Sequence, residues 1–100
     1  MIWAKRSFEF AAYAPYMDRL EKLLMANPTL YRQFIMVSTK TDDPGVDDYY
    51  VGVPALAFMT GFDGFEIVSE DQLPKEIDTL HLADGTTDEF KSHFRFRGGR

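Results

Sequence analysis

The segment Pro15-Tyr-Met-Asp-Arg-Leu-Glu-Lys-Leu-Leu-Met-Ala26 carries the clearest structural signal in the chain. Its apolar residues recur at helical spacing and form one stripe: Tyr16, Leu20, Leu23 and Leu24. Pro15 suits the first helical position, where its missing N–H costs nothing, and Asn27-Pro28 is a stop signal. We therefore expect a helix over residues 15–26 that packs its apolar stripe on another element.

Strand patterns lie on both sides of this helix. Residues 2–10 alternate between apolar and polar side chains, except that Arg6 interrupts the apolar face. Residues 30–39 are apolar on both faces, which predicts a strand covered on two sides. The polar, turn-rich residues 41–48 then separate this strand from another at 49–53. Residues 30–53 thus form a predicted β-hairpin with an eight-residue tip.

The second half of the chain also contains both helix and strand patterns, in shorter segments. Pro54 opens, and Gly61 closes, a short predicted helix over residues 55–60. Strands are expected at 65–68 and 77–82. Thr86 and Glu89 match a capping box, which predicts a C-terminal helix of about two turns. The last residues, 95–100, are expected to fray.

The order of these elements predicts a single α+β domain over residues 1–100, a small antiparallel sheet with two or three helices packed on it. The first six elements match the ferredoxin-like plan β-α-β-β-α-β. An extra strand and a C-terminal helix would follow. Other α+β arrangements remain open.

Composition excludes several classes of protein. Hydrophobic residues make up 45% and charged residues 27%, as in folded proteins. Because there is no cysteine, disulfide frameworks, thiolate catalysis and iron–sulfur ligation are excluded. No apolar run resembles a secretory leader or reaches the 18 or so residues that span a bilayer. We expect a soluble cytoplasmic protein without a membrane partner.

Charge is unevenly distributed along the chain. Residues 1–40 carry six Lys/Arg against three Asp/Glu, residues 41–90 one against thirteen, and residues 91–100 four against none. The acidic middle disfavours nucleic acid as a partner, because it repels phosphates. The basic ends have the charge to pair with the acidic stretch, although a solvated acidic surface is the simpler interpretation.

Motifs for chemistry are absent. Four aspartates in residues 42–48 lack the spacing of a calcium loop, and neither His81 nor His93 has a metal-ligand or triad spacing to a partner. There is no Gly-x-Ser-x-Gly elbow or phosphate loop. We therefore predict no catalytic residue, no metal and no cofactor, and the sequence favours a non-enzymatic role.

Aromatic residues make up 15% of the chain, more than one small core needs. This surplus predicts an interaction or regulatory module that binds a protein partner, or a second copy in a homodimer, through an aromatic-rich surface. The alternative is a small ferredoxin-like enzyme or ligand-binding protein with an apolar pocket between sheet and helices or at a dimer cleft. Its polar groups would come from Arg6, Arg32 and His81. A closed pocket of about 300 Å³ or more lined by these side chains favours the alternative, and a flat apolar patch favours the module.

Overall fold

The computed structural model describes residues 1–83 and 93–97 of the chain. Its elements, in chain order, are β1 (Ile2–Glu9), α1 (Phe10–Ala26), β2 (Ile35–Lys40), β3 (Val46–Val53), α2 (Ala55–Gly61), β4 (Glu66–Val68), the 3-10 helix η1 (Glu70–Gln72), β5 (Glu76–Ile77), β6 (Thr79–Leu82) and β7 (Arg95–Phe96). The predicted α+β class is confirmed.

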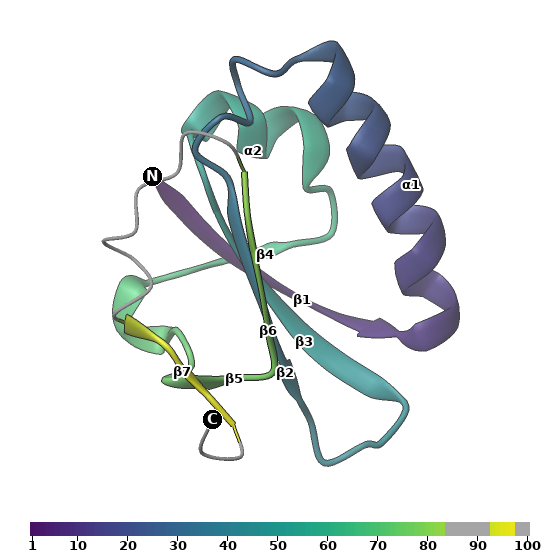
Figure 1. Cartoon of the computed structure of the whole chain (residues 1–100), viewed down its shortest axis with the longest axis vertical. Helices are drawn as coiled ribbons and strands as arrows, with labels where there is room; N and C mark the ends of the chain where they lie inside the picture. The colour runs from purple at the N-terminus through teal and green to yellow at the C-terminus, as the bar shows by residue number, and fades with distance from the viewer. Residues whose placement is uncertain (84–92, 98–100) are drawn as a thin grey trace.

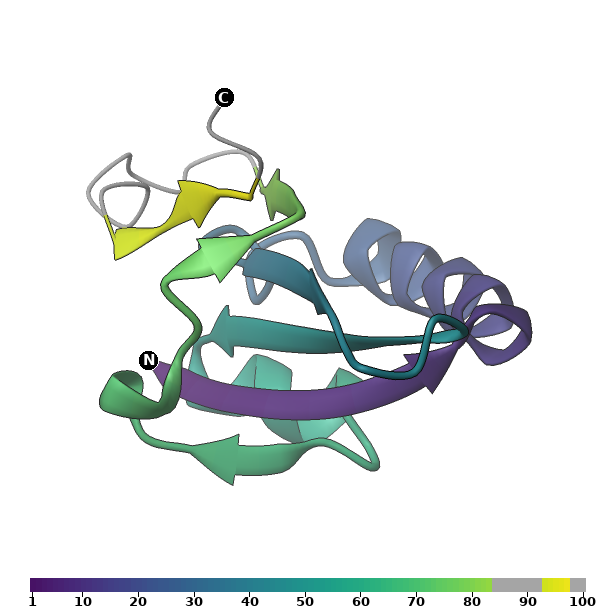
Figure 2. The same cartoon turned by 90° about the horizontal axis from the view of Figure 1, so that it is seen from below.

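The main sheet has five strands in the order β4-β1-β3-β2-β6, and every neighbouring pair is antiparallel. Figure 2 shows this succession from β4 at the bottom, through β1 in purple, to β3 and β2. The longest pairing joins β1 to β3 along all eight residues of each strand. The strands β5 and β7 form a separate parallel pair.

Both helices cover one face of the main sheet (Figure 1). The core on this face combines side chains of three strands with those of α1 and α2, and it includes Ala4, Phe8, Met36, Val51, Tyr16, Leu20 and Ala57. The predicted apolar stripe of α1 is confirmed at Tyr16 and Leu20, which are both buried. This helix face therefore packs on the sheet as its spacing predicts.

The opposite face of the sheet is also covered, by the segment that carries β5 and by Phe94 before β7 (Figure 1). The core on this side contains Trp3, Ile35, Val37, Tyr50, Ile77 and Phe94. The two apolar layers bury many of the rings: Trp3, Tyr16, Tyr49, Tyr50, Phe62, Phe65 and Phe94. Other rings lie at the surface, where Phe10 is 88% and Phe96 is 45% exposed.

The first helix begins earlier than predicted, at Phe10, and Pro15 lies inside it. The Phe10 N–H donates to the Gly45 carbonyl at 3.3 Å, so the hairpin loop satisfies one of the unpaired donors of the first turn. Tyr13, in the added turn, stacks on Tyr49 with ring centroids 4.4 Å apart. Pro15 and Ala11 are exposed, so solvent can reach the carbonyl that Pro15 leaves without a helix partner.

The tip of the hairpin is shorter than predicted, because β3 begins at Val46 and not at residue 49. The loop covers only residues 41–45, because the Thr41 hydroxyl donates to the Val46 carbonyl at 2.7 Å and the Asp43 carboxylate accepts from the Gly45 N–H at 3.0 Å. The prediction that residues 30–34 belong to the strand is wrong. Tyr31 lies in a turn and joins the core beneath the helices.

The C-terminal region differs from the prediction of a frayed tail. Arg95–Phe96 pairs with β5, and the Arg97 guanidinium lies 3.4 Å from the Asp78 carboxylate and 3.8 Å from that of Glu76. A basic end of the chain thus pairs with its acidic middle. The predicted strand 77–82 is divided at Asp78, whose carboxylate accepts from the Lys40 N–H at 2.7 Å. The predicted C-terminal helix lies mostly, and residues 98–100 entirely, outside the described residues.

Candidate functional site

A groove of about 470 Å³ lies between α1 and the segment from the end of α2 to the following turn. We call it the Arg6 groove. It is lined by Arg6 of β1, by Thr60, Gly61 and Asp63, and by one face of α1 that includes Tyr16, Arg19, Leu20, Lys22 and Leu23. Its size is that of a small-molecule site. In the described residues, an apolar helix stripe and three cations therefore meet in one hollow.

Arg6 occupies a position that its strand assigns to the core. It lies between Ala4 and Phe8 on the face covered by the helices. The guanidinium carbon lies 4.4 Å from the centroid of the Phe8 ring and 5.8 Å from that of Tyr16. One guanidinium nitrogen donates to the Asp63 carbonyl at 3.0 Å. Ring faces and one backbone acceptor thus fix the guanidinium at the groove.

The turn that follows α2 is shaped to accept this side chain. The Phe65 N–H donates to the Phe62 carbonyl at 3.1 Å, and Gly64 has a φ of +84°. A glycine suits this position because other residues seldom adopt a positive φ. A Cβ at Gly64 would lie 3.0 Å from a guanidinium nitrogen of Arg6. The glycine therefore lets the turn close over Arg6.

Two residues with hydroxyl groups, Tyr16 and Thr60, line the groove. The Tyr16 hydroxyl donates to the Gly61 carbonyl at 3.3 Å, and the hydroxyls of Tyr31 and Thr60 are 3.1 Å apart. Burial raises the pKa of Tyr16 well above its ordinary value of 10.0, although the nearby Arg6 and Arg19 act in the opposite direction. Tyr16 is therefore a neutral hydrogen-bonding group at the groove.

The charge of the groove is unbalanced. Arg6, Arg19 and Lys22 face one carboxylate, Asp63. Within residues 1–83 and 93–97, no ion pair joins any of these three cations to an acidic side chain. Asp63 meets Arg6 through its backbone carbonyl. The groove therefore has a surplus of positive charge.

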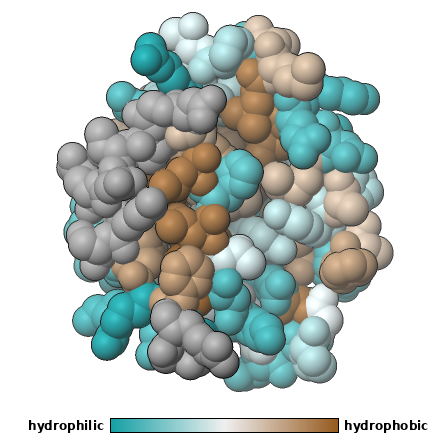
Figure 3. Space-filling view, in the orientation of Figure 1, coloured by the Kyte–Doolittle hydropathy of each residue, from teal (hydrophilic) through white to brown (hydrophobic). Residues whose placement is uncertain are grey.

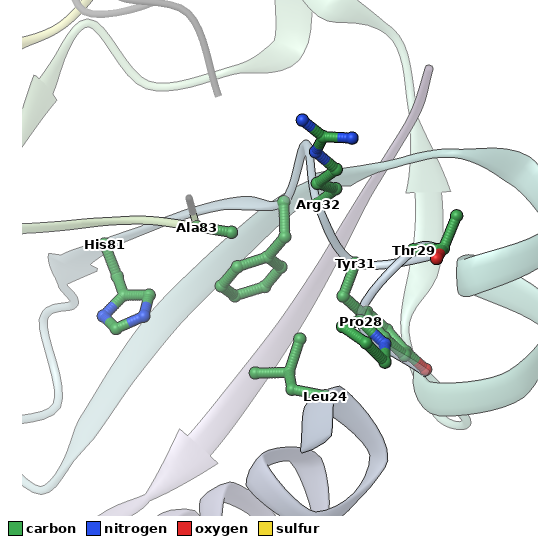
Figure 4. Close-up of a pocket in the computed structure, with 8 residues that line it drawn as sticks. Leu24, Pro28, Thr29, Tyr31, Arg32, His81 and Ala83 are labelled. Carbon is green, nitrogen blue, oxygen red and sulfur yellow. The ribbon is translucent and has the colours of Figure 1, made fainter. Parts of the chain in front are cut away.

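A second hollow, of about 400 Å³, contains the other two predicted residues (Figure 4). His81 of β6 lies with its ring edge toward Phe34, with ring centroids 5.7 Å apart. Arg32 comes from a turn and not from a strand, and its guanidinium points away from Leu24 and His81. Arg32 and His81 are both exposed. Arg19 and Lys22 of the Arg6 groove are exposed as well, so Arg6 is the one predicted site residue whose side chain is partly buried.

The three predicted site residues are thus divided between two places. Arg32 and His81 line the second hollow, whereas Arg6 lies in its own groove. Arg19 and Lys22 were not predicted, because the helix pattern assigns them to its solvated face. The sequence could have indicated them, because Arg19 and Lys22 are three residues apart and therefore lie on one side of α1.

Metal ligation has no support in the described part of the chain, where no three His, Asp or Glu side chains form a cluster suited to a metal ion. No helix there has both the length and the apolar character needed to cross a membrane. No protein-family model, curated protein or solved structure matches this chain. Function must therefore be inferred from the chemistry of the Arg6 groove.

Proposed function

We propose that this chain is a small ligand-binding domain, and not an enzyme, that holds an anionic small molecule in the Arg6 groove. One observation carries the proposal. The Arg6 side chain is half-buried and its guanidinium is fixed by Phe8 and by the Asp63 carbonyl, yet it forms no ion pair with a carboxylate among the described residues. A bound anion would supply the missing partner.

The physical argument concerns the donors that Arg6 leaves free. A guanidinium has five N–H donors in a planar fork that matches an oxyanion, and the Asp63 carbonyl accepts from one nitrogen. Because the aromatic contacts fix the side chain before a ligand arrives, little conformational entropy is lost on binding. Leu20 and Leu23 add apolar surface for the rest of the ligand.

We also propose that the domain follows the ferredoxin-like plan, with β6 as the extra strand. The order β4-β1-β3-β2 and the placement of both helices on one face support this arrangement. In such a plan the helix-covered face offers a hollow between the two helices and the sheet. The Arg6 groove lies beside that face.

Binding is tested by recording amide chemical shifts while benzoate, phenyl phosphate or neutral benzyl alcohol is added. We expect the anions, but not the alcohol, to shift the amides of Tyr16, Gly61 and Gly64. Arg6→Met keeps an apolar side chain over Phe8, and it should abolish these shifts while the spectrum stays dispersed. Arg32→Met is the matched control and should leave them unchanged. Absence of groove shifts, or shifts confined to His81 and Ala83, would refute the proposal.

A second candidate is self-association through α2. Leu56 and Met59 lie one helical turn apart and are 64% and 75% exposed, and Ile67 of β4 is 62% exposed. Apolar side chains at this spacing suit a helix that packs on its own copy, and we propose a homodimer through this face. Figure 3 shows a separate apolar area over β6, beside the grey region and on the other side of the sheet from α2.

Light scattering after size exclusion tests the homodimer over a range of protein concentrations. We expect a dimer that Leu56→Glu or Met59→Glu dissociates. Glu66→Gln, an exposed change on the neighbouring strand, should leave the mass unchanged. A monomer at every concentration would rule out this second candidate and leave the Arg6 groove unaffected.

A further inference from the structure

The charge of the Arg6 groove identifies the class of anion more narrowly. Three cationic side chains line it, and Asp63 is the one acidic side chain among its described lining residues. The remaining imbalance is two positive charges. Arg6 is partly buried, whereas Arg19 and Lys22 are exposed. Because charges of one sign repel one another, a ligand that balances all three is held more tightly than one that leaves a cation unmatched.

We infer that the ligand is a soluble phosphate monoester with an apolar or aromatic group, an inference that rests on the proposed ligand-binding function. Above its second pKa of about 6, a phosphate monoester carries two negative charges and offers three acceptor oxygens. These oxygens match the cations in number. A carboxylate has one charge and two oxygens, and it would leave a cation unmatched.

The chemical types of the three cations agree with this assignment. The guanidinium groups of Arg6 and Arg19 can each donate two parallel hydrogen bonds to phosphate oxygens, whereas Lys22 acts as a point charge on a flexible stem. Arg6 is fixed in place, whereas the two cations on α1 are not, so the three side chains have different roles in binding. Arg6 orients the phosphate, and the helix cations add charge.

The apolar group of the ligand is expected to lie on Leu20 and Leu23. These side chains line the same groove as the cations, on the same helix. A volume of about 470 Å³ exceeds what inorganic phosphate fills and is typical of small organic ligands. A phosphorylated small molecule therefore fits the groove better than a bare anion.

Phenyl phosphate and phenyl sulfate provide the matched test. They have the same ring and the same tetrahedral anion, but at about pH 8 the phosphate has two charges and the sulfate one. By calorimetry we expect phenyl phosphate to bind about tenfold more tightly, as one additional charge-assisted interaction implies. The advantage should disappear at about pH 5, where the phosphate loses one charge.

Substitutions on α1 locate the source of this preference. Arg19→Gln and Lys22→Gln should each reduce the affinity for phenyl phosphate by about tenfold and leave that for phenyl sulfate nearly unchanged. Lys40→Gln, a cation outside the groove, is the control and should change neither affinity. Equal binding of sulfate and phosphate at the higher pH would overturn the phosphate inference while leaving anion binding intact. Failure of every anion to bind would overturn both.

Two further probes distinguish the source of the phosphate group. Inorganic phosphate, which lacks an apolar part, should bind more weakly than phenyl phosphate. Vesicles of phosphatidylcholine containing phosphatidic acid present the same group on a membrane, and we expect no cosedimentation with them. Cosedimentation that depends on Arg6, without binding of soluble phenyl phosphate, would show that the protein binds the phosphate group on a lipid surface. That result would refute the inference.

Discussion

Gly61, where α2 ends against the core, offers a sharp test of the packing around the Arg6 groove. A Cβ placed on this glycine would lie 2.5 Å from the Tyr31 hydroxyl oxygen and 3.4 Å from the ring carbon that bears it. Tyr31 is 1% exposed, so its hydroxyl cannot withdraw without displacing the core. We therefore expect Gly61→Ala to destabilise the protein through this one contact.

The magnitude follows from two opposing effects. Alanine in place of glycine in a helix contributes up to about 1 kcal/mol of stability. Overpacking a core by one methyl group costs about 1–3 kcal/mol. The net effect of Gly61→Ala should thus be a loss of about 1 kcal/mol in the free energy of unfolding. Tyr31→Phe alone removes the hydrogen bond to Thr60 and should cost about 1 kcal/mol.

The double variant distinguishes a steric effect from a general weakening of α2. Once the hydroxyl is absent, the nearest Tyr31 atom is at an ordinary contact distance, so Gly61→Ala should become neutral or stabilising in the Tyr31→Phe background. Urea unfolding of the four proteins gives the coupling free energy, which we expect to be about 1–3 kcal/mol. Additive effects would refute the packing described for this site.

Two further predictions concern stability. Arg97→Ala should lower the free energy of unfolding by about 1 kcal/mol, because the ion pairs with Glu76 and Asp78 and the hydrogen bond to the Thr39 hydroxyl are lost. The loss in the free energy of unfolding should shrink in high salt. Arg95→Ala is the control, because Arg95 is exposed and makes no ion pair with the described residues, and it should have little effect. Equal losses for the two variants in urea unfolding would contradict this prediction. In an alkaline absorbance titration, Tyr16 and Tyr49 should ionise well above pH 10.0 in the folded protein, because burial raises the pKa of both. As the pH rises, the unfolded chain releases these protons before the folded protein does. The free energy of unfolding should therefore be level below about pH 10 and fall above it. Titration of all five tyrosines near pH 10 would be inconsistent with the burial.

Periodicity predicted which faces of the longer helix and strands are buried. The α1 stripe, the two-sided β2 and the alternation of β1 all hold in the structure. The predicted ends of helices and strands were wrong where a contact with a residue distant in sequence determines them. The early start of α1 depends on the Gly45 carbonyl, and the break at Asp78 depends on Lys40. Neither contact leaves a local pattern in the sequence.

Besides the element boundaries, periodicity could not predict the number of apolar layers in the core. An aromatic surplus was inferred by assuming one core, but the segment that carries β5 and the residues before β7 create another. Ile77 of β5 comes from the connection between β4 and β6, and Phe94 comes from residues well after β6. Large apolar side chains remain exposed at both ends of α1, at Phe10 and Met25, and on α2, at Leu56 and Met59.

Arg6 shows how a departure from pattern can indicate a site. The alternation of β1 assigns this position to the apolar face, and a charge there must find compensation or remain costly. In the structure its compensation is partial, through the Phe8 ring and the Asp63 carbonyl. Arg32 and His81 break no pattern, because each is exposed and solvated. A cation on a strand's buried face is therefore the stronger indication of a ligand, because water cannot fully replace the anion that it lacks.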